Sequence, residues 1–305
     1  MRDVKGYLMI MGAATLWGVS ATAAKFLLIR HVDTVLIVQT RVTISAFLMT
    51  LFYLFARPHL LRVRWRDLWQ FALLGIVGVS GANFTYYFTI KQSTVATAII
   101  LQYTAPLAVM VYTTLAGEEK FTPSKLLAAI LSLAGCFLAV GVYDPGVLRL
   151  PMIGLISGIG SMVCFAFLSV YTRHLLRRFN IWTMTVYSFI FASLFWLVVN
   201  PPGMIASQSP SGATWGGLVV LAVISVLIPH SLFFAGMQYV VASRAIITST
   251  LEPIVAMTSA AIVLGELLRP VQVIGAAFVV CAIVLLQMRR EGEDIVGQAG
   301  KINAA

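Results

Sequence analysis

Long apolar runs alternate with short polar interruptions along almost the whole chain. About 20 apolar residues are enough to carry a helix across the hydrocarbon core of a bilayer. The runs lack the strict alternation of a membrane β-barrel strand, and a helix satisfies its own backbone hydrogen bonds in lipid. The pattern therefore predicts an all-α membrane protein with ten transmembrane helices, at roughly 7–29, 34–56, 68–90, 94–115, 123–142, 152–172, 181–200, 215–239, 243–265 and 270–288.

The composition agrees with a lipid environment. The 305 residues are 60% hydrophobic and only 10% charged, with a mean hydropathy of +0.93, whereas a soluble domain is about 25% charged. The first apolar run is too long for the core of a signal peptide, so we expect it to be a retained span. Cys136, Cys164 and Cys281 all lie inside apolar runs without a CxxC pair. We therefore expect neither a disulfide nor a metal site.

Basic residues predict the orientation of the chain. With the N-terminus in the cytoplasm, fifteen Lys and Arg residues fall on the cytoplasmic side and four on the other side. Such an excess is typical of cytoplasmic loops. We therefore expect a multi-pass protein of the inner (plasma) membrane with both termini in the cytoplasm, including a polar tail at 289–305. On this interpretation the net charge of +10 reflects topology and does not indicate a nucleic-acid partner.

The two halves of the chain resemble each other when one is shifted by 147 or 148 positions. The matched positions include Pro106 and Pro253, Trp17 and Phe165, Asn83 and His230, and Tyr87 and Phe234. Each half holds five predicted spans, an odd number, so the second half must cross the membrane in the opposite sense. Such inverted repeats are typical of secondary transporters that bind substrate near the midplane. We predict two inverted repeats, at 1–142 and 152–288.

Glu252 is the most unusual residue of the apolar runs. With Pro253 it interrupts the ninth span, and its counterpart in the first half is Ala105. Burying a carboxylate costs about 2.5–3.5 kcal/mol on insertion scales and is tolerated chiefly inside a bundle or a wet cavity. One interpretation is structural: Glu252 is protonated, or bonded to backbone groups freed by Pro253. The other is functional: it binds an ammonium group or takes up a proton during transport.

Further polar side chains lie in the third, fourth and eighth spans. Asn83 and His230 lie near the middles of their spans, and each is followed one turn later by an aromatic residue. They are either packing partners or cavity residues. Gln102 and Tyr103 precede Pro106, where we expect a broken or kinked helix that lines a cavity.

Three basic residues lie near the outer ends of spans in the first half. Snorkelling to the headgroups explains Lys25 and Lys91. Arg41 lies about a third of the way into its span and needs a partner or water. Together they would make an outer vestibule attractive to anions.

Four stretches resemble a known family: TLWGVSATAAKFLL, YYFTIKQSTVATAIILQYTAPL, FFAGMQYVVASRAIITSTLEPI and LEPIVAMTSAAIVLGELL. As an ordered set covering roughly 7–288, they are similar to the EamA-type members of the drug/metabolite transporter superfamily. The resemblance implies a ten-helix bundle with a cavity lined by the first, third, fourth, sixth, eighth and ninth helices. It also implies transport of small metabolites, often export of amino acids and sometimes driven by protons. The first half has Ala-Pro where some members have Glu-Pro, so paired acids are not implied.

These observations predict a transporter rather than an enzyme. We expect export of an amino acid or a related amphipathic solute by alternating access, with the bilayer and a small solute as partners and protons as a candidate coupling ion. Aromatic side chains stack on flat groups and bind amines through their faces. The predicted substrate-binding residues are Trp17, Asn83, Tyr87, Gln102, Tyr103, Phe165, His230, Phe234 and Glu252.

Catalytic, metal and cofactor sites are not expected, because HExxH, GxSxG and Cys/His clusters are absent from the sequence. Two alternatives remain. One is a carrier of anionic nucleotide- or phosphate-bearing metabolites, for which Lys25, Arg41 or Lys91 would be essential and Glu252 dispensable. The other is a lipid flippase. The oligomeric state is left open.

Overall fold

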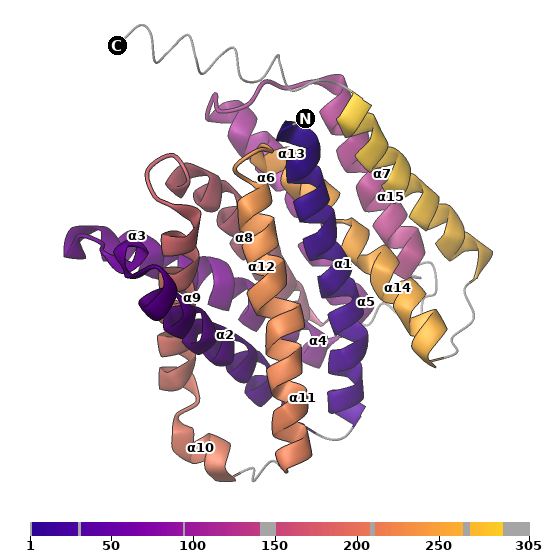
Figure 1. Ribbon diagram of the computed structural model, residues 1–305. Helices are drawn as coiled ribbons and strands as arrows, with labels where there is room; N and C mark the ends of the chain where they lie inside the picture. The colour runs from indigo at the N-terminus through magenta and orange to yellow at the C-terminus, as the bar shows by residue number, and fades with distance from the viewer. Residues whose placement is uncertain are drawn as a thin grey trace, which may run out of the picture.

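The computed structural model describes residues 2–29, 32–93, 95–140, 151–207, 211–264 and 269–288. Within these ranges all regular structure is helical and no strand is present (Figure 1). The first half contains α1 (Arg2–Ile29), α2 (Thr34–Ala56), the 3₁₀ helices η1 (Pro58–Leu61) and η2 (Trp65–Asp67), α3 (Leu68–Leu73), the π-helix η3 (Leu74–Gly81), α4 (Ala82–Gln92), α5 (Val95–Gln102), α6 (Ala105–Leu115) and α7 (Pro123–Val140). The second half contains α8 (Met152–Leu175), α9 (Ile181–Val199), α10 (Pro202–Ser207), α11 (Gly212–Ala222), the π-helix η4 (Val223–Leu227), α12 (Ile228–Gly236), α13 (Ala242–Thr248), α14 (Leu251–Leu264) and α15 (Pro270–Met288). The predicted tail at 289–305 and the side chain of Lys25 lie outside the described residues.

Among the residues that the structure describes, eight helical stretches are long and apolar enough to cross a membrane: Val35–Ala56, Trp65–Gln92, Thr97–Leu115, Pro123–Val140, Met152–Leu175, Ile181–Val199, Gly212–Gly236 and Ala242–Val263. They coincide with the second to the ninth predicted spans. The predicted first and tenth spans are helical as α1 and α15, of 28 and 19 residues, but are not among these eight. The chain is therefore a multi-pass membrane protein, and the count of ten spans stays a prediction.

Two of the spans are broken helices. Residues 103–104 separate α5 from α6, and residues 249–250 separate α13 from α14. Pro106 and Pro253 each lie in the first turn of the helix that follows the break. A proline is tolerated there because the amide it lacks would have no intrahelical partner. The expected break before Pro106 is present, and the second half has one at the matching position.

The third and eighth spans each contain a π-helical stretch. η3 precedes α4 without interruption, and η4 joins α11 to α12. The two stretches fall at corresponding places when the halves are shifted by 147 positions. π-Helical turns are rare overall, and those that occur are often at functional sites. The two stretches are therefore candidates for parts of a site.

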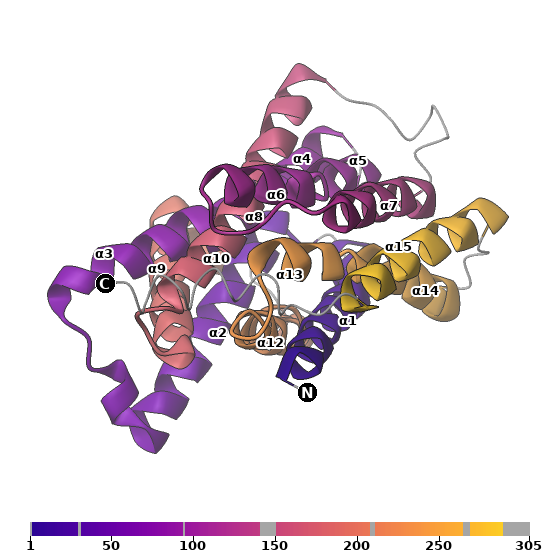
Figure 2. The same cartoon turned by 90° about the horizontal axis from the view of Figure 1, so that it is seen from above.

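Helices of one half pack against helices of the other. α1 packs on α12 and α14, and α8 packs on α4, η3, α5 and α6. α7 and α15 lie side by side (Figures 1 and 2). The two helices come close at a pair of glycines, because a Cβ atom on Gly135 would lie 2.6 Å from the carbonyl oxygen of Gly275. Small residues allow such close contact between helices in lipid.

A buried carboxylate ties the segment after α6 to both α7 and α13. Gly117, with a φ of 67°, ends α6 in a left-handed conformation. Glu119 follows it, and its Oε2 accepts a hydrogen bond from Nζ of Lys125 at 3.2 Å. Ser243, in the first turn of α13, donates its backbone N–H to Oε1 of Glu119 at 3.3 Å and its hydroxyl to Oε2. The carboxylate thus links the two halves and caps a helix N-terminus, where negative charge is favourable.

Candidate functional site

A cavity of about 380 Å³ lies between the two halves. Its wall is formed by α1, α2, η3, α4, α5, α8, α12 and α14, together with Tyr103 from the break after α5. These elements include all six spans that the resemblance implied, and α2 in addition. Most of the wall is apolar or aromatic, but it contains one carboxylate, one guanidinium and one imidazole.

Glu252 reaches the cavity from the first turn of α14. The hydroxyl of Tyr103 donates a hydrogen bond to its Oε2 at 2.7 Å and lies 3.3 Å from the carbonyl oxygen of Ser249. Both broken helices therefore meet at this contact, one from each half. α1 packs closely against the backbone of Glu252, because a Cβ atom on Gly18 would lie 2.7 Å from its carbonyl oxygen. Only a glycine allows α1 to approach the acid's backbone this closely.

Arg41 is the one Lys or Arg side chain that lines the cavity among the described residues. Its side chain is buried, with 7% of its surface exposed. Nη1 donates to the hydroxyl of Tyr87, whose ring centroid lies 5.8 Å from the guanidinium carbon, and Nη2 lies 3.5 Å from the carbonyl oxygen of Ser225. Nε has no hydrogen-bond partner within the part of the chain that the structure describes.

The rings of Trp17 and His230 pack against each other beside η4. The indole N–H of Trp17 donates to the carbonyl oxygen of Ser225 at 3.1 Å. The rings of Trp17 and His230 meet edge to face, with centroids 5.1 Å apart and an interplanar angle of 78°. The ring of Phe189 packs edge to face on His230 from α9, at 5.7 Å. The imidazole is thereby held by packing as well as by hydrogen bonding.

Asn83 and His230 make the same contact in the two halves. Nδ2 of Asn83 donates to the carbonyl oxygen of Val79 at 2.7 Å, and Nδ1 of His230 lies 3.2 Å from the carbonyl oxygen of Val226. In each case the acceptor lies four residues earlier, inside the π-helix. The equivalence predicted from the 147-residue shift therefore extends to this hydrogen bond. It also gives the π-helices a role, because they present these carbonyl groups to a side chain of the cavity wall.

Eight of the nine residues predicted for the site line the cavity: Trp17, Asn83, Tyr87, Gln102, Tyr103, Phe165, His230 and Glu252. The ring centroid of Phe165 lies 6.3 Å from that of Tyr103, so aromatic groups of both halves meet in the cavity wall.

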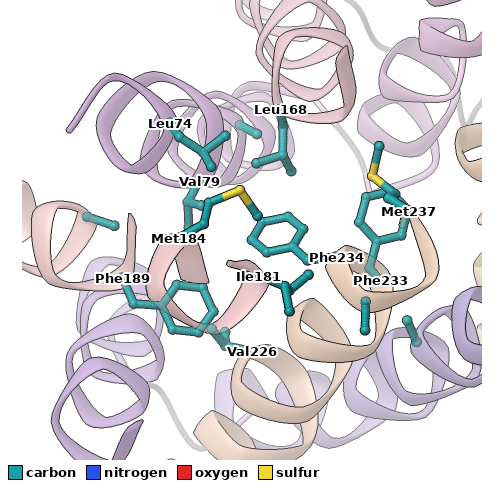
Figure 3. Packing of buried hydrophobic residues seen from close by; sticks show 14 of the residues in the cluster. Leu74, Val79, Leu168, Ile181, Met184, Phe189, Val226, Phe233, Phe234 and Met237 are labelled. Atoms are coloured by element: carbon teal, nitrogen blue, oxygen red, sulfur yellow. The ribbon is translucent and has the colours of Figure 1, made fainter. Parts of the chain in front are cut away.

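Phe234 is not part of the cavity wall. It is fully buried in the main core cluster, and Figure 3 shows its ring pointing toward Met184 of α9. Four residues of an α-helix turn by about 400°, so Phe234 is rotated about 40° from the face of His230 and lies one turn further along α12. That displacement is enough to take it from the cavity into the core, which corrects the predicted position.

Three polar cavity residues were not among the predicted set: Ser20, Arg41 and Tyr86. A helical-spacing argument would have found two of them, because Ser20 lies three residues after Trp17 and Tyr86 three residues after Asn83. Arg41 was expected in an outer vestibule with Lys91. The structure instead places Arg41 in the cavity wall, whereas Lys91 is exposed and does not line the cavity.

Comparisons with known proteins agree with this architecture. The model of a family described as the EamA-like transporter family matches residues 4–141 and again 152–288. The uncharacterized inner membrane transporter YicL of Salmonella typhimurium is 23% identical over 291 residues, covering 93% of this chain and 95% of that protein. An uncharacterized transporter of Archaeoglobus fulgidus is 29% identical over 214 residues, covering 69% of this chain and 75% of its own. A crystal structure with 20% sequence identity shares the fold, with a TM-score of 0.77 over 93% of this chain and 96% of that one.

Proposed function

The chain belongs to the EamA-like transporter family, and we propose that it exports an amino acid or a related amphipathic solute across the inner membrane by alternating access. The observation that carries this proposal is the cavity, which both halves line and which combines aromatic walls with one carboxylate and one guanidinium. Aromatic rings stack on flat or apolar groups and attract ammonium groups to their faces. An amphipathic solute fits this mixture better than an ion or a sugar does.

Four observations support an inverted repeat as the basis of alternating access. The family model matches each half separately. The halves share their helix breaks and their π-helices at positions about 147 residues apart. α1 packs on the eighth and ninth spans, and α8 packs in the same way on the third and fourth. Two similar units that grip one site can rock about it, which exposes the site to each side of the membrane in turn.

Glu252 is the residue on which the proposal depends most. It supplies the negative charge of the cavity and would bind the ammonium group of the solute or a proton in alternate steps. Transport by the wild-type protein should then change with pH, because protons and solute compete for the same carboxylate. Trp17, Asn83, Tyr87, Gln102, Tyr103, Phe165 and His230 would form the rest of the binding surface.

The test is efflux of a radiolabelled amino-acid mixture from proteoliposomes that contain the full chain. Glu252→Gln should lower the efflux rate by at least about tenfold, which corresponds to one charge-assisted hydrogen bond. Glu118→Gln is the matched control, since this acid lies in the segment after α6 and does not line the cavity. Efflux by Glu252→Gln at the wild-type rate at every pH at which the protein stays folded would remove Glu252 from the mechanism.

The position of Arg41 favours a second candidate, a carrier of anionic phosphate-bearing metabolites. That carrier would need Arg41 and tolerate Glu252→Gln, because a carboxylate in the cavity repels an anion. The same vesicles loaded with labelled phosphate esters distinguish the two. Efflux of esters that survives Glu252→Gln and is lost in Arg41→Gln would favour the anion carrier and contradict the export of amino acids.

A further inference from the structure

Exposed arginines gather at the connection between α2 and α3, away from the cavity. The connection runs from Arg57 through η1 and η2 to Asp67, and Figures 1 and 2 both show it at the edge of the bundle. The turn after α8 adds two more arginines. The exposed arginines of the two segments, here called the arginine surface, are Arg57, Arg62, Arg64, Arg66, Arg177 and Arg178.

The flanking side chains place the arginine surface at the boundary of the bilayer. Phe52 and Phe55, in the last two turns of α2, are largely exposed, as expected for side chains that face lipid. Trp65 in η2 and Trp69 in α3 are also largely exposed, and tryptophan is enriched where a membrane meets water. Because the spans on both sides of the connection enter the hydrocarbon, the connection itself lies at the level of the lipid headgroups.

Hydrogen bonds fix the connection on the second half of the chain. The hydroxyl of Thr183 donates to the carbonyl oxygen of Leu60, and the hydroxyl of Tyr187 donates to that of Leu61, both at 2.7 Å. Both donors belong to α9. The side chains of the two leucines pack against the main core cluster. The arginine surface is therefore held in a defined position and is not part of a free loop.

The local backbone turns the arginines outward. Arg62 and Arg64 have extended backbone angles, and successive side chains of an extended chain point to opposite sides. Val63, between them, packs on the core cluster, whereas both arginines are exposed. The guanidinium carbon of Arg66 lies 5.6 Å from the ring centroid of the exposed Trp65. An aromatic ring and several guanidinium groups thus share one outer face.

A single buried carboxylate pairs with only part of the arginine surface. Asp67 is 5% exposed. Its Oδ2 lies 2.8 Å from Nε of Arg64, and its Oδ1 lies 4.0 Å from Nη2 of Arg178. This contact joins the two arginine-bearing segments. The arginines that form no ion pair within the described residues are Arg57, Arg62, Arg66 and Arg177.

We propose that the arginine surface binds the headgroup of an anionic phospholipid in the leaflet that the sequence predicts to be cytoplasmic. A guanidinium group pairs with two phosphate oxygens through parallel hydrogen bonds. Clusters of four or more basic residues directly beside a span are typical of anionic-lipid recognition. Residues 63–67 also line a hollow in the surface that would receive the headgroup.

The aromatic side chains favour a lipid over a soluble phosphate or a nucleic acid as the occupant. Trp65 and Trp69 lie beside the arginines and are exposed, so they would contact the glycerol backbone and the upper part of the acyl chains. The site is separate from the cavity, because none of the six arginines lines the cavity among the described residues. The proposal therefore holds whatever solute the cavity carries.

A general attraction between basic loops and a negatively charged membrane makes a different prediction. In that case every exposed cation on the same side of the membrane contributes about equally. A defined site depends on which cations are removed. Lys5 and Lys120 are exposed, lie outside the arginine surface and are predicted to be on the same side of the membrane, so they provide the matched control.

The experiment measures lipid binding to the purified full chain in mixed micelles by native mass spectrometry. Wild-type protein should bind phosphatidylglycerol at least about tenfold more tightly than phosphatidylcholine. At roughly fivefold for each arginine, Arg62→Gln/Arg66→Gln should weaken the binding of phosphatidylglycerol about 10- to 30-fold, to near that of phosphatidylcholine. Lys5→Gln/Lys120→Gln removes the same charge and should leave both affinities unchanged. Equal losses in the two double variants, or equal affinity of the wild type for the two lipids, would overturn the proposal.

Two further measurements test the nature of the contact. Raising NaCl to about 0.5 M should weaken the binding of phosphatidylglycerol to the wild type severalfold by screening, and unchanged binding would contradict an electrostatic site. Glycerol 1-phosphate, which is the headgroup phosphate without acyl chains, should not displace bound phosphatidylglycerol at millimolar concentration. Displacement would identify a site for a soluble phosphate and overturn the assignment to lipid.

A second variant keeps the test decisive if the first does not fold. Arg177→Gln removes an arginine without an ion-pair partner from the other segment of the surface. It should weaken the binding of phosphatidylglycerol about fivefold and leave that of phosphatidylcholine unchanged. Wild-type affinity for phosphatidylglycerol in this variant would contradict a site that spans both segments.

Discussion

Glu119 offers a sharp test of the buried contacts that fix the segment between α6 and α7. Glu119→Gln keeps the size of the side chain and removes its charge. Lys125, whose side chain is 2% exposed, then loses the carboxylate 3.2 Å from its Nζ, and Ser243 keeps only a neutral acceptor. Breaking a buried ion pair by removing one partner costs about 3–5 kcal/mol. For a chain of 305 residues we expect Tm to fall by roughly 5–8 °C.

Thermal denaturation of detergent-solubilised protein, followed by size-exclusion chromatography, measures this change. The double variant Glu119→Gln/Lys125→Met should regain at least half of the loss, since an apolar replacement of a buried pair is often neutral. Arg64→Gln is the control, because Arg64 is 78% exposed in its 2.8 Å pair with Asp67 and such a pair contributes about 0–1 kcal/mol. If the Tm of Glu119→Gln falls no further than that of the control, or if the double variant is no more stable than the single one, the buried pair does not stabilise the protein as expected.

Two further predictions concern packing and topology. Gly18→Val should destabilise the protein by about 1–3 kcal/mol, because a Cβ at this position meets the carbonyl oxygen of Glu252 at 2.7 Å. Gly12→Val should destabilise it less, because a Cβ there meets only Leu232, at 3.6 Å. Thermal denaturation measures both variants, and equal losses of stability would contradict the close approach of α1 and α14. Arg64→Cys, in a chain whose native cysteines are replaced by alanine, should react with an impermeant maleimide only from the cytoplasmic side, and labelling from the outside of intact cells would reverse the orientation.

Eight of the spans and most of the residues of the cavity wall could be predicted from the sequence, because both depend on local patterns. A run of 20 apolar residues must form a helix in lipid whatever surrounds it. Pro106 marked a break in the same way. A carboxylate at position 252 had few tolerable environments, and the cavity supplies one of them. These inferences required no knowledge of how the helices pack.

Features that depend on helix rotation and tertiary contact were beyond the sequence. The rotation of α2 about its axis decides whether Arg41 faces lipid, a vestibule or the cavity. That rotation depends on the packing of α2 against α9 and η4, which one sequence does not reveal. The predicted position of Phe234 in the cavity wall was wrong for a similar reason, since about 40° of rotation about the helix axis separates the cavity from the core. The segments LGIVGVSG and VISVL contain no pattern that predicts a π-helix, because the wider turn is stabilised by its surroundings. The contact between Tyr103 and Glu252 joins residues 149 positions apart and required the assembled fold.

Alternating access requires that one cavity between the two halves opens to each side of the membrane in turn. Asn83→Cys, made in a chain without native cysteines, places a single thiol in the wall of that cavity. Its reaction with an impermeant maleimide is measured in right-side-out and in inside-out vesicles. A cavity that alternates should be labelled in both orientations, and the transported solute should slow the reaction in each. Labelling from one side only, or from neither, with the variant still folded, would contradict it.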